Sequence, residues 1–147
     1  ARAFAEGYDL AAFYQQTRTS YGVVSVDAVS AWCPPFARFP YEVWLLPQRR
    51  VAGPWDLDEG EQEAFAALLG EMTRRYDAMF GESTPYMLAL HAAPKGMEQA
   101  YHFTAQFYPI LRAPGRLKYL ASVEQHTGVF TVDVMPEQAA AELRAVT

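Results

Sequence analysis

Three histidines, His91, His102 and His126, are the first residues in this 147-residue chain whose type could support chemistry. Three imidazoles can form a zinc site, although their spacing alone is a weak signal. His91 and His102 stand near the ends of two predicted strands that a short loop connects, and antiparallel pairing would bring these ends together. The structural alternative places His102 on a half-polar sheet face and His126 in a loop.

Two basic clusters are the other candidates for a binding site. They comprise Arg49-Arg50 and the group Arg112, Arg116 and Lys118. The second cluster contains Gly115, and a glycine lets backbone amides approach an anion closely. The clusters therefore indicate either a phosphate site or ordinary solvated charge. The sequence contains no P-loop, dinucleotide fingerprint or G-x-S-x-G elbow.

Composition narrows the class of protein further. The chain is 51% hydrophobic and 20% charged, which excludes a disordered chain and suits one folded domain. Its formal net charge of -5 argues against nucleic-acid binding, because phosphate neutralisation requires surplus Lys and Arg. No apolar run is long enough for a membrane span. The single cysteine, Cys33, cannot form an internal disulfide, so we expect a buried role and a reducing cytoplasm.

The elements that must position these residues follow from periodicity and from turn residues. The strongest prediction is a helix from Asp58 to Gly81, with a capping box of Asp58 and Glu61 and an apolar face at steps of three or four. A shorter helix is predicted over 1–17, and a closing helix over 137–144 after Pro136. Strands are predicted over 21–26, 28–32, 41–46, 85–91, 101–108 and 129–134.

The strand over 101–108 has clean alternation, which assigns its side chains to two faces. Phe103, Ala105 and Phe107 share one face, whereas Thr104 and Gln106 share the other with His102 and Tyr108. Strands interrupted by one long helix predict an α+β domain with an antiparallel β-sheet flanked by helices. We expect one domain over residues 1–147, with residues 1–20 as a helical lead-in.

Six segments in order resemble the galactose-1-phosphate uridylyltransferase family. They are FPYEVWLLPQR (39–49), DLDEGEQEAFAALLGEMTRRYDAMF (56–80), PYMLALHAAP (85–94), HFTAQFYPILR (102–112), LKYLASVE (117–124) and PEQAAAELRAV (136–146). The match runs from about Val23 to the end of the chain. Enzymes of this family consist of two histidine-triad-like halves, and this chain resembles the C-terminal half. The resemblance therefore implies a histidine-triad (HIT)-like fold.

The resemblance implies the activity of a UDP-glucose–hexose-1-phosphate uridylyltransferase. In the family, a histidine of a His-Pro-His motif attacks the α-phosphorus of UDP-glucose, and galactose 1-phosphate then accepts the uridylyl group from the enzyme. That motif belongs to the N-terminal half and does not occur here, so no catalytic residue is expected in this chain. The implied partners are a sugar nucleotide, a hexose 1-phosphate, the N-terminal catalytic half and a second subunit of a homodimer.

The resemblance also implies a substrate site and a metal site. Lys118, Tyr119 and Glu124 match the family's sugar-contacting segment, in which a lysine neutralises the sugar phosphate and a glutamate accepts from sugar hydroxyls. The family binds zinc or iron, and His91 matches one of its ligands. Thr104 and Gln106 replace the other two, so we expect no metal cofactor here. An alternative hypothesis is a non-catalytic, degenerate HIT-like module for binding or dimerisation.

Overall fold

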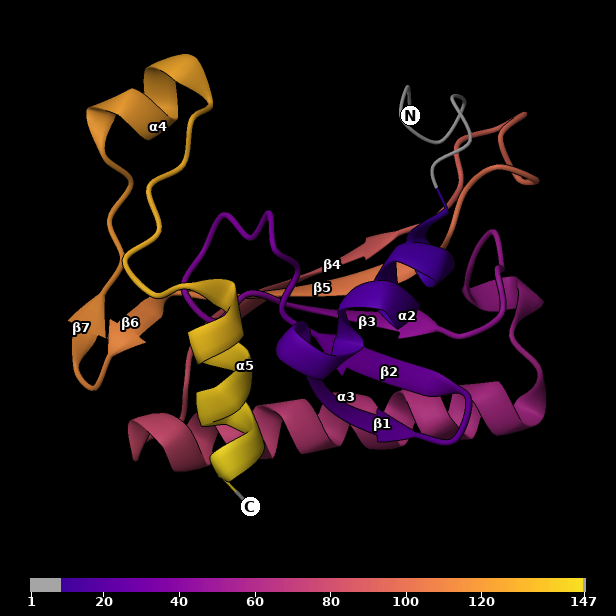
Figure 1. The fold of residues 1–147 in the computed structure, drawn as a ribbon, viewed down its shortest axis with the longest axis horizontal. Coiled ribbons are helices and arrows are strands. Elements are labelled where there is room, and N and C mark those ends of the chain that lie inside the picture. Colours follow the sequence, from indigo (N-terminus) through magenta and orange to yellow (C-terminus); the bar gives the residue numbers. More distant parts are fainter. Residues whose placement is uncertain (1–8, 147) are drawn as a thin grey trace.

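The computed structural model describes residues 9–146 of the chain, and its centre is one five-stranded antiparallel sheet (Figure 1). The strands are β1 (Gly22–Val26), β2 (Val29–Trp32), β3 (Val43–Pro47), β4 (Tyr86–His91) and β5 (Thr104–Pro109). Their order in the sheet is β1-β2-β3-β5-β4. The predicted α+β class with an antiparallel sheet is therefore confirmed.

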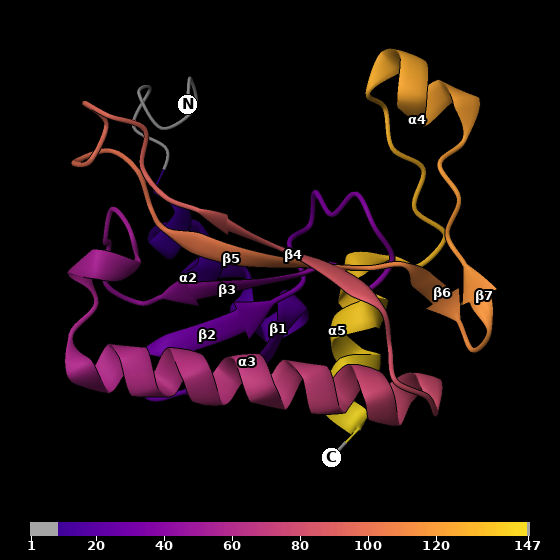
Figure 2. The same cartoon turned by 180° about the vertical axis from the view of Figure 1, so that it is seen from behind.

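Helix α3 (Glu59–Phe80) covers one face of the sheet (Figure 2). Asp58 accepts from the Glu61 amide and Glu61 accepts from the Asp58 amide, so the predicted capping box is confirmed. Gly81 ends the helix in the left-handed region, with φ 72, which glycine adopts without a Cβ clash. Leu68, Met72 and Tyr76 of its apolar face are fully buried in the main core. This packing holds the sheet that positions the candidate site.

Residues 9–146 contain three further α-helices and one short 3-10 helix, η1 (Pro54–Asp56). Helix α5 (Pro136–Ala145) packs against β1 and α3, with its Ala139, Ala140 and Leu143 in the main core. Helix α2 (Leu10–Tyr21) lies on the sheet face opposite to α3, where Leu10 and Tyr14 pack against Trp32 and Leu46. The six-residue helix α4 (Ser122–Thr127) stands clear of the sheet in both views (Figures 1 and 2). No helix in residues 9–146 is long and apolar enough to cross a membrane.

Several predicted boundaries are corrected by the structure. The first helix begins at Leu10, with Asp9 as its N-cap, and continues to Tyr21 rather than ending at 17. The part of that prediction over residues 1–8 lies outside the described residues. Strand β5 begins at Thr104 rather than at 101, because the Phe103 amide donates to the Val51 carbonyl instead of to a neighbouring strand.

The segment over 129–134 is the clearest error of the sequence-based prediction. It was predicted as a strand from its β-branched residues, yet it forms no strand in the structure. Its backbone bonds to side chains instead: the Thr131 amide donates to Glu124, and the Thr131 carbonyl accepts from Lys118. Helix α4, which precedes it, was not predicted. His126 therefore lies in a helical turn rather than in a loop.

Strand β4 forms one edge of the sheet, with β5 as its neighbour. Its register with β5 is regular from Tyr86 to His91. Helix α3 leaves this strand uncovered, and Leu90, the most exposed of its apolar side chains, is 58% exposed. The edge strand is thus apolar and open.

Candidate functional site

The candidate site lies in the excursion between the sheet and α5. A short hairpin of β6 (Leu111–Ala113) and β7 (Arg116–Leu117) leads into it, and the chain then passes through α4 and returns toward α5 (Figure 1). The excursion encloses a pocket of about 310 Å³. The residues lining this pocket are Arg112, Lys118, Tyr119, Ala121, Glu124, Thr131, Val132 and Asp133. All three sequence-predicted substrate residues are among them.

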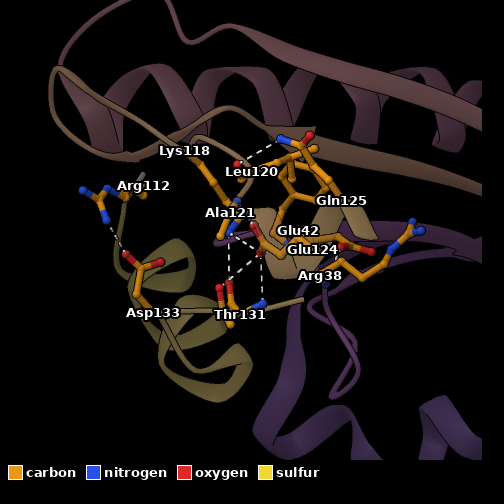
Figure 3. Close-up of polar contacts among 11 residues, drawn as sticks. Arg38, Glu42, Arg112, Lys118, Leu120, Ala121, Glu124, Gln125, Thr131 and Asp133 are labelled. Atoms are coloured by element: carbon orange, nitrogen blue, oxygen red, sulfur yellow. Dashed lines mark hydrogen bonds and ion pairs between the residues drawn. The ribbon is translucent and has the colours of Figure 1, made fainter. Parts of the chain in front are cut away.

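Glu124 forms the inner wall of the pocket. Its side chain has no exposed surface, and its Oε1 accepts from Lys118 Nζ at 2.9 Å and from the amide and hydroxyl of Thr131 (Figure 3). Its Oε2 accepts from the Ala121 amide at 2.6 Å. Hydrogen bonds to the carboxylate lower the pKa of Glu124 to about 2; the bond from the Ala121 amide has the largest effect, and those from Lys118 and the Thr131 amide come next. The carboxylate is therefore ionised and cross-links the two arms of the excursion.

Lys118 is paired inside the pocket rather than extended into solvent. Its side chain is only 7% exposed, and its Nζ donates to Glu124 and, at 2.9 Å, to the Thr131 carbonyl. A lysine ammonium carries three N–H groups, so these two bonds leave one donor for a ligand. Glu124 holds this ammonium in place, and together they form a fixed cationic donor at the pocket.

Three other pocket residues contribute polar groups or a ring at the surface. Tyr119 is 80% exposed, so its ring can contact a bound ligand from the solvent side. Arg112 Nη1 lies 3.2 Å from Asp133 Oδ2, and both side chains are about half exposed. The sequence grouped Arg112 with the basic cluster, but nothing in it marked Asp133 as its partner, because 21 residues separate them.

The other sequence-predicted cations are used within the structure. Arg49 donates twice to the buried Glu61, at 3.0 and 2.6 Å, which fixes the start of α3. Arg50 pairs with Asp9 at the start of α2. The segment between β3 and α3, to which both belong, lies at the opposite end of the sheet from α4 (Figure 2), so the two basic clusters do not converge on one site.

The three histidines do not converge either. His91 is the register partner of Thr104 in β4 and β5, whereas the ring of His102 donates from Nε2 to the Pro47 carbonyl at 2.7 Å. His126 lies on α4, so the zinc hypothesis built on the three imidazoles is wrong. Cys33 is fully buried, and burial raises the pKa of its thiol, which suits the predicted packing role.

His91, Thr104 and Gln106 do share one face of β4 and β5, as the family resemblance implies for metal ligands. The donors present do not fit zinc or iron. Gln106 Nε2 donates to Thr104 Oγ1 at 3.0 Å, and Gln106 Oε1 accepts from the Tyr108 hydroxyl, so both side chains are engaged. A neutral hydroxyl and an amide are also poor ligands for these metals. Within residues 9–146, no group of three or more His, Cys, Asp or Glu residues could hold a metal.

Comparison with known proteins identifies the family. Residues 9–147 match the family described as "Galactose-1-phosphate uridyl transferase, C-terminal domain". The galactose-1-phosphate uridylyltransferase of Thermotoga maritima is 39% identical over 125 residues, which cover 83% of this chain and 39% of that protein. The corresponding enzyme of Haemophilus influenzae is 34% identical, over 85% of this chain and 36% of its own length. This chain thus spans well under half of these relatives.

Solved structures agree with this assignment. A uridylyltransferase mutant is 27% identical, with a TM-score of 0.88 over 98% of this chain and 48% of that one. A zinc-bound histidine triad family protein from Mycobacterium smegmatis shares the fold, with a TM-score of 0.64 at 11% identity. The predicted HIT-like fold is thereby confirmed. The chain belongs to the family of galactose-1-phosphate uridyl transferase C-terminal domains.

Proposed function

We propose that this chain is the C-terminal half of an enzyme that transfers a uridylyl group between UDP-glucose and a hexose 1-phosphate. Its family membership supports the reaction, and the fixed ammonium of Lys118 at the pocket supports the role of this half. The relatives that match this chain are named galactose-1-phosphate uridylyltransferase. The alternative, a non-catalytic binding module, is not favoured by these relatives.

The pocket offers the two kinds of group that a hexose 1-phosphate requires. The remaining N–H of Lys118 and the guanidinium of Arg112 can bind the phosphate. Glu124 has no exposed surface, so it serves the substrate by holding the Lys118 ammonium, and the half-exposed carboxylate of Asp133 is the pocket acceptor that a sugar hydroxyl can reach. The exposed ring of Tyr119 then packs against the sugar.

The reaction itself needs groups from outside this chain. Because no His-Pro-His motif occurs in residues 1–147, the nucleophile must come from an N-terminal catalytic half. We place the hexose-phosphate pocket next to that half, in a homodimer. We also propose that residues 1–147 form one domain and that the enzyme is cytoplasmic, which the single, buried Cys33 supports.

Isothermal titration of the purified chain with galactose 1-phosphate, UDP-glucose and UMP tests the role of the pocket. We expect galactose 1-phosphate to bind and Lys118→Met to weaken its binding about 10- to 100-fold, the usual worth of a hydrogen bond to a charged group. Arg116→Met is the matched control, since Arg116 lies in the same basic segment but does not line the pocket. Equal losses in both variants would contradict the assignment of Lys118.

Steady-state kinetics of the full-length enzyme test the same residues when the other half is present to complete the pocket. There, Lys118→Met should raise KM for the hexose 1-phosphate while Arg116→Met leaves it unchanged. An unchanged KM in the Lys118 variant would remove this residue from the substrate site.

A further inference from the structure

A chain of side-chain hydrogen bonds runs along the face of β5 that carries the family's metal positions. Arg38 Nη2 donates to the Tyr108 hydroxyl at 2.7 Å, and that hydroxyl donates to Gln106 Oε1. Gln106 Nε2 then donates to Thr104 Oγ1 at 3.0 Å. Each member donates to the next, starting from a guanidinium that is always charged. The chain ends at the Thr104 hydroxyl, directly opposite His91.

The three members on β5 are buried, so the bonds between them are protected from water, whereas Arg38 at the start of the series is exposed. Thr104, Gln106 and Tyr108 are 2%, 5% and 7% exposed. His91 presents a buried Nε2 with no hydrogen-bond partner in the described structure. His91 and Thr104 are therefore register partners whose side chains share one face, and no hydrogen bond joins them. Arg38, Tyr108, Gln106 and Thr104 thus bond to one another without an ion, whereas His91 Nε2 has no partner among the described residues.

The start of the chain is held by a second buried group. Glu42 is 1% exposed, and its Oε2 accepts from the amides of Arg38 and Phe39 at 2.7 and 3.1 Å. Its Oε1 accepts from Trp44 Nε1 at 2.7 Å. These bonds fix the loop backbone beside β3, and Figure 3 shows Glu42 together with Arg38 and the pocket residues. The backbone position from which the Arg38 side chain extends is therefore fixed.

Arg38 also contacts the segment that forms the pocket. Its Cζ lies 5.2 Å from the centre of the Tyr108 ring and 5.7 Å from that of Phe130. The Phe39 ring contacts both rings as well, at 5.5 and 6.1 Å between centroids. Phe130 directly precedes Thr131, whose backbone bonds to Glu124 and Lys118. One guanidinium thus links the sheet face to the pocket segment.

We propose that this Arg38-led chain replaces the family's metal as the cross-link on this sheet face, and that Arg38 is a positioning residue for the pocket. The place of the metal comes from the family assignment, whereas the role of Arg38 rests on the contacts above. Neither depends on the identity of the substrate, so the proposal stands or falls separately from the titrations described for Lys118.

Thermal unfolding with and without a chelator, together with elemental analysis, tests the first part on the 147-residue chain. We expect less than a tenth of an equivalent of zinc or iron and the same Tm in both conditions. One equivalent of bound metal with a Tm that falls on chelation would overturn the proposal. Tyr108→Phe retains the ring but loses the hydroxyl, so it should increase amide exchange in β4 and β5.

Hydrogen exchange in Arg38→Met tests the positioning role. We expect amide exchange over residues 118–134 to rise about 5- to 10-fold, the scale of one lost cation–π contact or hydrogen bond. Exchange in β2 and β3 should stay unchanged. Arg74→Met is the matched control, because Arg74 is an exposed residue of α3 that pairs with Glu71 and, among the described residues, has no bond to the pocket segment. An equal rise in β2 and β3, or none over 118–134, would overturn the positioning role.

Arg38→Lys separates the two contacts of the guanidinium. Lysine keeps the charge and a donor for Tyr108, but it lacks the planar group that stacks on Phe130. We therefore expect native exchange in β4 and β5 and an intermediate rise over 118–134. Exchange equal to that of Arg38→Met in both regions would contradict this division.

Discussion

The double substitution Thr104→His and Gln106→His should create a metal site on the face of β5 where the protein now has a series of side-chain hydrogen bonds. His91 and Thr104 are direct register partners, so their Cβ atoms are about 4.5–5.5 Å apart. Residues 104 and 106 point to the same face, about 6.7 Å apart along the strand. Imidazoles at 91, 104 and 106 can then converge on one zinc ion, whose bonds to nitrogen are about 2.0–2.1 Å long.

The expected stability change has two opposing parts. Both positions are buried, and overpacking costs about 1–3 kcal/mol at each. The bond from Gln106 to Thr104 is also lost, at about 1 kcal/mol, so the metal-free variant should be roughly 3–7 kcal/mol less stable. Zinc at 100 times its Kd restores about 2.7 kcal/mol. For a chain of this length, that corresponds to a rise in Tm of about 5–11 °C.

Elemental analysis and thermal unfolding with added zinc measure both quantities. Circular dichroism first establishes that the metal-free variant is folded, and Thr104→His alone gives a milder background if it is not. The same double variant carrying His91→Asn is the control, because it retains two imidazoles and loses the third. A folded double variant without bound zinc, or uptake that His91→Asn leaves unchanged, would refute the inherited geometry.

Two further predictions concern the pocket and the long helix. The pKa of Glu124 is lowered, so its ionised form stabilises the pocket segment fully above about pH 4.5, and this contribution is lost as the pH falls toward about 2. Amide exchange over 118–134 measured against pH should show this loss, and Glu124→Gln should abolish its pH dependence; a loss centred near pH 6 would contradict the assignment. Gly70 lies inside α3 with open space around it, so Gly70→Ala should raise the free energy of unfolding by about 0.5–1 kcal/mol. Gly81→Ala should lower it by about 1–2 kcal/mol, because Gly81 has a positive φ; urea unfolding of the pair checks both signs, and equal signs would refute the argument.

Local rules predicted the parts of the fold that local interactions determine. The capping box at Asp58, the apolar face of α3 and the stop at Gly81 are all encoded within a few residues, and all three occur. The alternation over 101–108 likewise assigned Ala105 and Phe107 to one face of a strand, and both lie in the main core. The order of strands was not accessible, because pairing β3 with β5 spans a connection of more than fifty residues.

The excursion over 118–134 shows where local rules fail. Its β-branched residues favour a strand, but in the described structure it pairs with no strand. The buried carboxylate of Glu124 supplies the acceptor for the Thr131 amide instead. Sequence spacing placed Lys118 and Glu124 in one site, but it could not show that they bond to each other. That pairing depends on how the chain turns back through α4, which is a tertiary property.

The open edge strand β4 has a consequence for how the separated chain behaves in solution. Natural sheet edges usually carry lysine, proline or a bulge that prevents another strand from adding. Residues 86–91 contain none of these, and four of their apolar side chains are at least 40% exposed: Tyr86, Met87, Leu88 and Leu90. Such an edge is a template on which β4 of a second molecule can pair. Aggregation of the isolated chain should therefore depend on protein concentration as well as on folding stability.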